Sequence, residues 1–271
     1  MFRAIAIISL ALALLTAPIS VCADEWADFN DYLDRYYFID DHEFEKIICS
    51  VEVETLNQLL DYVFRNVGNQ AGVVIQENLS DFQVVFDRQL GLSFQKPSIR
   101  VSVPQHQDKS RNEQKQKGAR MIEEGFDRSV YGTVMVLEGL FESYIRPKRP
   151  GFSLQSFAIG PEKVKFGYMQ KDQNFQVQCG ENQCARKVST GVMNVESTEK
   201  YEFRNRKYFL RSTRGVLSDS MQTITTTINV DYINVGGVEL PASITGSSQL
   251  RSASTTMDGK IKIMLKNCQI E

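Results

Sequence analysis

Two alternating segments joined by paired glycines decide the fold: Met221-Gln-Thr-Ile-Thr-Thr-Thr-Ile-Asn-Val-Asp-Tyr-Ile-Asn-Val235, then Gly236-Gly237, then Val238-Glu-Leu-Pro-Ala-Ser-Ile244. Apolar and polar side chains alternate in both segments, which is typical of β-strands with one buried face. Paired glycines supply the positive φ angles that a tight hairpin turn requires. The stretch therefore predicts a long antiparallel hairpin near the C-terminus.

Alternating segments continue on both sides of this hairpin. Asp258-Gly259 is a second favourable turn sequence. Besides the hairpin, strands are expected at residues 46–53, 82–86, 92–94, 99–103, 152–159, 164–169, 175–179, 187–195, 201–203, 207–210 and 260–270. The expected fold is α+β: a strongly curved antiparallel sheet of about ten strands, covered by two or three helices.

Three segments repeat apolar residues at helical spacing. Residues 24–45 hold nine carboxylates against one Arg, with an inward aromatic stripe. Thr55 and Gln58 match a capping box that begins a second helix, which ends at Gly68. Residues 122–144 form the most apolar helix and stop before Pro147. The basic stretch 105–120 before it predicts a solvated loop or an exposed first turn.

The composition is that of a globular protein. The chain has 271 residues, of which 42% are hydrophobic and 24% charged, and a formal net charge of -2. These values exclude a disordered, collagen-like or coiled-coil chain and a polybasic nucleic-acid binder. We expect residues 24–271 to form a single β-rich domain with a helical insertion at 105–149.

The N-terminus has the layout of a secretory signal peptide over residues 1–23. Arg3 precedes an apolar run from Ala4 to Leu15, and Val21-Cys22-Ala23 provides a cleavage site after Ala23. A lipid on Cys22 is the alternative, although Val21 is bulkier than the residue that normally precedes such a site. The sequence therefore predicts a periplasmic or secreted protein.

Four cysteines remain after cleavage, an even number in an oxidising compartment. Cys179 and Cys184 flank a loop short enough for a hairpin disulfide, which leaves Cys49 to pair with Cys268. The alternative is a metal site, but two cysteines separated by four intervening residues, with no nearby histidine, have poor zinc spacing. We expect two disulfides and neither a metal nor another cofactor.

No catalytic motif is evident. His42 and His106 lie in polar segments without a second histidine at metal-ligand spacing. The sequence has no serine-hydrolase elbow, zinc-protease helix or phosphate-binding loop. The many carboxylates leave a glycosidase pair open, but such sites need aromatic sugar platforms, and the only tryptophan is Trp26 in the acidic helix. A non-enzymatic function is predicted.

Inward-facing apolar residues suggest a binding surface. The alternation places one face of each strand toward the interior, where its side chains either line an open concavity or pack under the helices. The apolar helix would act as a lid over such a concavity. The candidate ligand-binding residues are Val134, Leu137, Phe141, Phe166, Tyr168, Phe175, Val177, Ile224 and Ile228.

The order of elements and the passage Tyr232–Pro241 resemble the periplasmic outer-membrane lipoprotein carrier family and its lipid-binding relatives. The insertion at 105–149 and the four cysteines depart from that pattern. The resemblance implies a half-open β-barrel covered by helices. It also implies a monomeric carrier that holds a lipid, an acyl chain or a lipidated protein non-covalently and meets a membrane-associated donor or acceptor. The alternative is a non-catalytic structural or interaction module of the cell envelope with a filled core.

Overall fold

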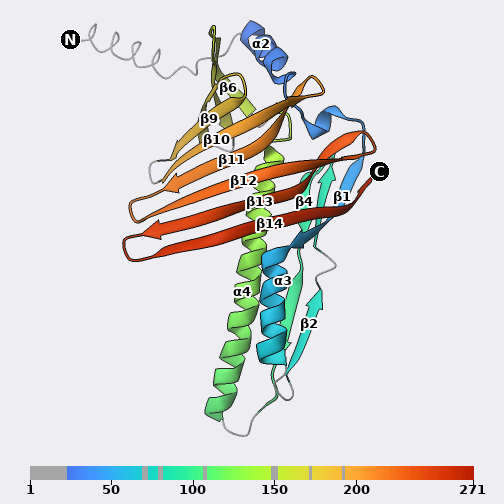
Figure 1. The fold of residues 1–271 in the computed structure, drawn as a ribbon, viewed down its shortest axis with the longest axis vertical. Helices are drawn as coiled ribbons and strands as arrows, with labels where there is room; N and C mark the ends of the chain where they lie inside the picture. Colours follow the sequence, from blue (N-terminus) through green and yellow to red (C-terminus); the bar gives the residue numbers. More distant parts are fainter. Residues whose placement is uncertain are drawn as a thin grey trace, which may run out of the picture.

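The computed structural model describes residues 23–68, 73–78, 82–105, 109–147, 152–170, 173–190 and 193–271. The predictions for the signal peptide, for Cys22 and for His106 lie outside these residues. Within them, the α+β class is confirmed: the chain forms a large antiparallel sheet and three α-helices (Figure 1).

The main sheet has twelve strands in the order β4-β3-β1-β14-β13-β12-β11-β10-β9-β8-β7-β6. From β6 to β14 each strand pairs with the next along the chain, and β1 pairs with both β14 and β3. The bounds are β1 (Lys46–Val53), β3 (Gln83–Asp87), β4 (Gly91–Gln95), β6 (Phe152–Ile159), β7 (Val164–Gln170), β8 (Gln173–Cys179), β9 (Gln183–Thr190), β10 (Met193–Arg204), β11 (Lys207–Ser218), β12 (Gln222–Val235), β13 (Val238–Ser252) and β14 (Thr256–Ile270). A separate two-stranded sheet pairs β2 (Val74–Asn78) with β5 (Ser98–Ser102).

Several strand predictions need correction. The main sheet has twelve strands rather than about ten, and β2 was not predicted. The sheet ends in the free edges β4 and β6 and is not strongly curled, so the half-open barrel stays a prediction. The single strand expected at 187–195 is the end of β9 and the start of β10, which face each other with Val195 opposite Val188. Apolar and polar residues keep alternating through this reversal of the chain, so the sequence pattern does not show where β9 ends and β10 begins.

One of the two predicted hairpin turns is confirmed. Gly236 and Gly237 connect β12 to β13 with φ angles of +57° and +90°. Asp258-Gly259 is not a turn, because both residues lie inside β14, where Gly259 is opposite Ser248 of β13. The chain reverses earlier, where the Ser252 N–H donates to the Thr255 carbonyl over 2.8 Å. Cross-strand pairing thus outweighs the local turn preference.

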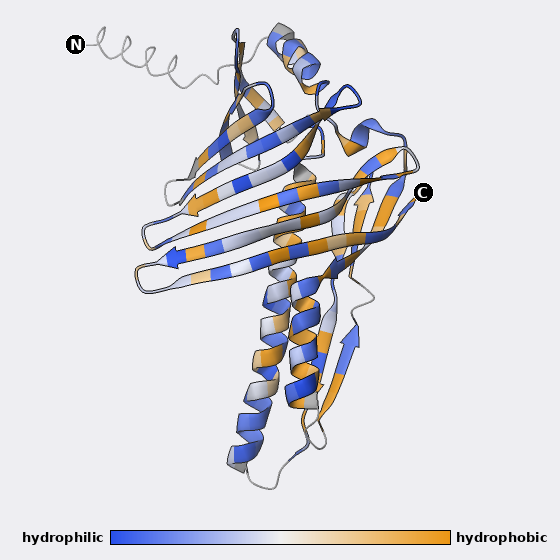
Figure 2. Cartoon of the chain, in the orientation of Figure 1, coloured by the Kyte–Doolittle hydropathy of each residue, from blue (hydrophilic) through white to orange (hydrophobic). Residues whose placement is uncertain are grey.

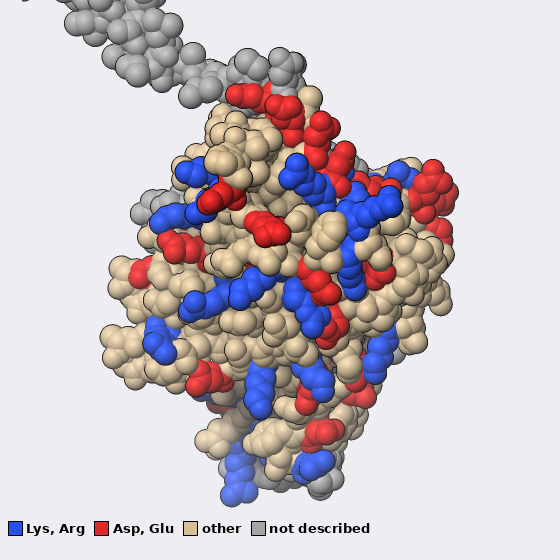
Figure 3. Space-filling view, turned by 45° about the horizontal axis from the view of Figure 1, so that its top comes forward, with Lys and Arg blue, Asp and Glu red and all other residues tan. Residues whose placement is uncertain are grey.

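The acidic helix is shorter than expected: α2 spans Ala23–Leu33. Figure 3 shows acidic side chains gathered beside the grey N-terminal segment. The sequence of α2 includes Glu25, Asp28 and Asp31. The helix ends because the next residues bond to a strand instead. The Tyr208 N–H of β11 donates to the Arg35 carbonyl over 2.7 Å, so the backbone leaves the helical path.

The other two helices also differ in their starts. Helix α3 (Glu54–Val63) directly follows β1, and its N-cap is Val53 without a side-chain cap, so the predicted capping box is wrong. Helix α4 spans Lys109–Glu142 and includes most of the stretch 105–120, which was predicted as a solvated loop or an exposed first turn. Lys, Arg, Gln and Glu are good helix formers whose charges can stay in water, so a charged run is compatible with helix.

Helix α4 crosses the sheet and extends beyond it beside α3 and β2 (Figure 1). Its buried residues Phe126 and Leu137 belong to the main core with Val230, Ile244 and Ile263 from the sheet. In Figure 2 apolar residues alternate with polar ones along the strands that α4 crosses. A second apolar cluster forms where α2 covers β6, β7 and β8. The described residues therefore form two neighbouring apolar clusters, of which the larger includes the buried face of α4.

Both predicted disulfides are confirmed. Cys49–Cys268 joins β1 to β14, and Cys179–Cys184 joins β8 to β9. Such bonds are compatible with a secreted or periplasmic protein. Among the helices of the described ranges, none combines the length and the apolar character that crossing a membrane requires.

We expect Gly246→Ala to destabilise the fold by roughly 1 to 3 kcal/mol, because a Cβ there would overlap the backbone carbonyl of Thr227 on β12. Backbone cannot move aside as a flexible side chain would. The control is Gly215→Ala in β11, where a Cβ meets no atom within 4 Å. Urea unfolding of both variants measures the difference, and equal unfolding midpoints would contradict the close approach.

Candidate functional site

A cavity of about 610 Å³ lies between the inner face of β7–β11 and the segments around α2 and the end of α4. Aromatic rings make up much of its wall, and backbone segments near residues 36–40 and 143–147 close one side. The rings on the wall include Phe29, Tyr32, Tyr36, Phe152, Phe166, Tyr168, Phe175, Tyr201 and Tyr208. The cavity therefore lies mainly against the smaller apolar cluster, and main-core residues such as Tyr37, Phe86 and Leu210 contribute the rest of its apolar lining.

Strand register explains why these side chains share one wall. Successive side chains of a strand point to opposite faces, so residues two apart share a face. Tyr168 is opposite Phe175, and Cys179 is opposite Cys184. Glu199 is in turn opposite Cys184 on the other side of β9. The inward positions of β7 to β10 therefore form one continuous surface.

The rings on this surface are tightly stacked. Phe152, Tyr168 and Phe175 form a ladder across three strands, with ring centroids 4.5 Å and 4.6 Å apart. Phe29 of α2 covers the ladder, with its centroid 5.1 Å from that of Phe166. Such aromatic pairs stabilise by more than their buried area alone. The wall is thus a rigid apolar surface.

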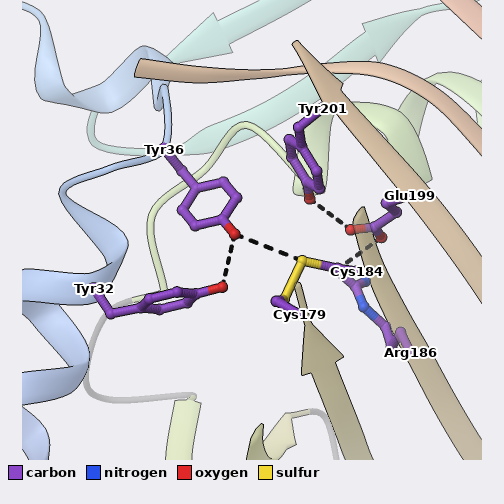
Figure 4. The surroundings of a disulfide bond; sticks show 7 residues. All are labelled: Tyr32, Tyr36, Cys179, Cys184, Arg186, Glu199 and Tyr201. Atoms are coloured by element: carbon purple, nitrogen blue, oxygen red, sulfur yellow. Dashed lines mark hydrogen bonds and ion pairs between the residues drawn. A yellow bond between two sulfur atoms is a disulfide. The ribbon is translucent and has the colours of Figure 1, made fainter. Parts of the chain in front are cut away.

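The Cys179–Cys184 disulfide lies in this wall beside two tyrosines (Figure 4). The Tyr36 hydroxyl is 2.7 Å from the Tyr32 hydroxyl and 3.7 Å from Cys184 Sγ. Burial raises the pKa of both tyrosines, mainly because a phenolate would lose its hydration. Both hydroxyls therefore stay protonated at physiological pH.

An ion pair between the half-buried Arg186 and the buried Glu199 interrupts the apolar wall (Figure 4). Arg186 Nη2 is 3.1 Å from Glu199 Oε1, and the Tyr201 hydroxyl donates to Glu199 Oε2 over 2.6 Å. Burial, and then the nearby Glu199 carboxylate, raise the pKa of Tyr201 well above its ordinary value. Tyr201 therefore remains a hydrogen-bond donor to the carboxylate.

A second polar network holds the opposite side of the cavity together. Arg146, which follows α4, bonds through Nε to Asp41 Oδ1 over 3.0 Å, and its backbone N–H donates to Asp40 Oδ1 over 2.9 Å. It also forms an ion pair with Asp34. These bonds raise the pKa of Arg146 against the opposing effect of burial. They tie the end of α4 to the segment after α2.

The structure brings only some of the predicted site residues together. Phe166, Tyr168, Phe175 and Val177 line the cavity. Val134, Leu137, Phe141 and Ile228 lie instead in the main core, and Ile224 is half-buried in β12 away from the cavity. The helix therefore does not supply the cavity lid, because its apolar face is already covered by the sheet.

Sequence reasoning missed the polar residues of the wall. Arg186 lies two residues from both Cys184 and Val188, and Glu199 lies two residues from Tyr201, so strand parity placed both charges inward. The sequence did hold a signal for these two residues: each is a charged side chain at a position where strand alternation predicts an inward, apolar one. The aromatic residues of the 24–45 segment were predicted to face inward, but not as part of a binding site.

No family model matches this chain, and searches of curated proteins and of solved structures give no match either. Within the described residues, no group of three or more His, Cys, Asp or Glu side chains could hold a metal ion. His42 packs against Tyr37, with ring centroids 5.3 Å apart. A function must therefore be argued from the cavity itself.

Proposed function

We propose that this protein is an exported carrier or binding protein that holds a lipid, an acyl chain or the acyl chain of a lipidated protein non-covalently in the cavity. The observation that carries the proposal is a cavity of about 610 Å³ with a largely aromatic and aliphatic wall. This volume falls within the range of roughly 300 to 1,000 Å³ that is typical of small-molecule sites. Affinity comes from burying apolar surface, at about 0.8 kcal/mol per methylene.

The contrast with the main core supports a carrier over a filled-core structural module. The gap among Ile39, Phe141 and Leu240 in the main core measures about 10 Å³, less than the cavity by more than an order of magnitude. Protein interiors rarely leave voids larger than a water molecule. A cavity of this size, with a largely aromatic and aliphatic wall, is thus suited to an occupant.

The cavity reaches the surface at the turn between β3 and β4. Arg88, Gln89 and Leu90 line it and are exposed, and Leu90 is 88% exposed. An apolar side chain at the mouth suits the entry of an acyl chain from a membrane-associated donor. The turn comes from one end of the strand order and Phe152 of β6 from the other, so residues from both ends of the sheet line the proposed binding cavity.

We expect Val177→Trp to abolish ligand binding at a smaller cost in stability than the same enlargement in the main core, because the buried Val177 side chain borders the cavity. The matched control is Ile228→Trp, which enlarges a side chain in the packed core and costs roughly 1 to 3 kcal/mol of stability. Thermal melts and titration of delipidated protein with a fluorescent fatty acid measure both quantities.

Native mass spectrometry of the exported protein gives an independent test, since a carrier should retain lipid through purification. The proposal fails if the delipidated wild-type protein shows no saturable binding and Val177→Trp destabilises it as strongly as Ile228→Trp. Those results together would favour the structural module.

A further inference from the structure

The Arg186–Glu199 pair is an unusual feature of the cavity wall, because Glu199 is buried and its charge has a desolvation cost that the attraction to the half-buried Arg186 offsets only partly. The neighbouring inward residues are mostly aromatic or aliphatic, so the packing of the wall does not require charged side chains at positions 186 and 199. Ligand pockets commonly hold a few polar groups that orient an otherwise apolar ligand. The pair is therefore a candidate for the recognition of a polar group.

Of the two charged groups, Arg186 is the more exposed. Its side chain is 32% exposed, whereas that of Glu199 is 7% exposed, and both line the cavity. Both carboxylate oxygens of Glu199 already have partners: Oε1 contacts Arg186, and Oε2 accepts the Tyr201 hydroxyl. The guanidinium is therefore the charged group of this pair that faces the cavity.

We propose that Arg186 binds the anionic head group, a carboxylate or a phosphate, of an amphiphile whose chain lies against Phe166, Tyr168 and Phe175. This inference rests on the carrier function proposed above. A guanidinium presents a planar fork of donors that matches both anions, and such charge-assisted bonds are shorter and stronger than neutral ones. The surrounding apolar wall strengthens the contact further.

Glu199 acts as a positioning residue in this arrangement. It holds the guanidinium against the wall of the empty cavity and competes with the anion for it. Glu199→Gln removes the competing charge but keeps an amide oxygen that can accept the Tyr201 hydroxyl. This variant should therefore bind an anionic amphiphile more tightly than the wild type, which a purely structural ion pair would not produce.

The natural reporter is Trp26, the only tryptophan of the chain. Its ring centroid is 5.7 Å from that of Phe29 and 5.9 Å from that of Phe152, and both rings line the cavity. Intrinsic fluorescence can thus follow titration of delipidated protein with palmitic acid, hexadecyl phosphate and methyl palmitate. The three probes share one chain length and differ in the head group.

The wild type should bind the two anionic probes at least about tenfold more tightly than the ester, as expected for a charge-assisted bond of roughly 1.5 kcal/mol or more. Arg186→Gln should abolish this preference and leave the affinity for the ester unchanged. The control is Lys187→Gln, because Lys187 is exposed and pairs with Glu196 across the strands. It should leave all three affinities unchanged.

Arg186→Gln leaves the buried Glu199 carboxylate without its arginine. The double variant Arg186→Gln/Glu199→Gln removes both charges, so it tests the head-group preference without an unpaired buried charge. If the double variant still prefers the anionic probes, the inference is overturned. It is also overturned if the preference is lost in Arg88→Gln but not in Arg186→Gln, because the head group would then lie at the mouth of the cavity. If the wild type binds the acid and the ester equally tightly, the proposed head-group site is overturned, but the proposed carrier function is not. Failure of all three probes to bind overturns the carrier proposal itself. The tighter of the two anionic probes identifies the head group as a fatty-acid carboxylate or a phosphate.

Discussion

The double variant Cys49→Ala/Cys268→Ala is expected to lose roughly 5 kcal/mol of unfolding free energy, the largest loss we expect from removing one covalent bond of this protein. The disulfide joins residues 219 positions apart, and so closes a loop that covers most of the chain. A crosslink over a long loop removes more conformational entropy from the unfolded chain than one over a short loop. Urea unfolding followed by circular dichroism measures the loss.

The internal control is Cys179→Ala/Cys184→Ala, whose disulfide spans only 5 positions. The same relation predicts a loss of about 2 kcal/mol for this short loop. The short disulfide lies in the cavity wall, so this variant should also change the response of Trp26 to ligand. A larger loss of stability for the short disulfide than for the long one would contradict the loop-closure explanation.

Phe141→Asp is expected to reduce the unfolding free energy by roughly 4 kcal/mol or more. Phe141 is 3% exposed and packs in the main core, so the variant removes a buried ring and introduces a carboxyl group without a partner. The expected effect is on stability, because Phe141 does not line the large cavity. Thermal and urea unfolding of the purified variant measure it.

Met135→Asp on the same helix is the matched control, since Met135 is 55% exposed. Its unfolding free energy should change by less than about 0.5 kcal/mol, as for most surface substitutions. Equal stability of the two variants would show that α4 does not place Phe141 in the core.

Much of the sheet was predictable because strand periodicity is a local property. The alternation in Phe152–Ile159 and across Gly236-Gly237 marks strands whose inner faces must be buried, and the structure has strands there. Errors arose where a local preference competed with pairing. Asp258-Gly259 favours a turn, yet continuous pairing with β13 keeps both residues extended.

The helices show the same competition. The charged residues 109–120 resemble a solvated loop, but they continue the helix that ends at Glu142. Charge favours exposure to water and does not decide between loop and helix. The acidic segment could not reveal its own end at Leu33 either, because the backbone bonds that end the helix come from Tyr208, far along the chain.

The sequence by itself determined the α+β class, the buried face of strands such as β6, β12 and β13, and the pairing of the four cysteines. Strand alternation is a short-range property, and the short loop between Cys179 and Cys184 leaves Cys49 to pair with Cys268. Only the tertiary structure decided which buried faces pack against each other and which enclose space. Phe141 and Phe175 carry the same side chain, yet one fills the core and the other lines a cavity of about 610 Å³. The physical reason is that periodicity records the removal of a side chain from water, whereas the volume between two apolar faces depends on how distant strands and helices are placed.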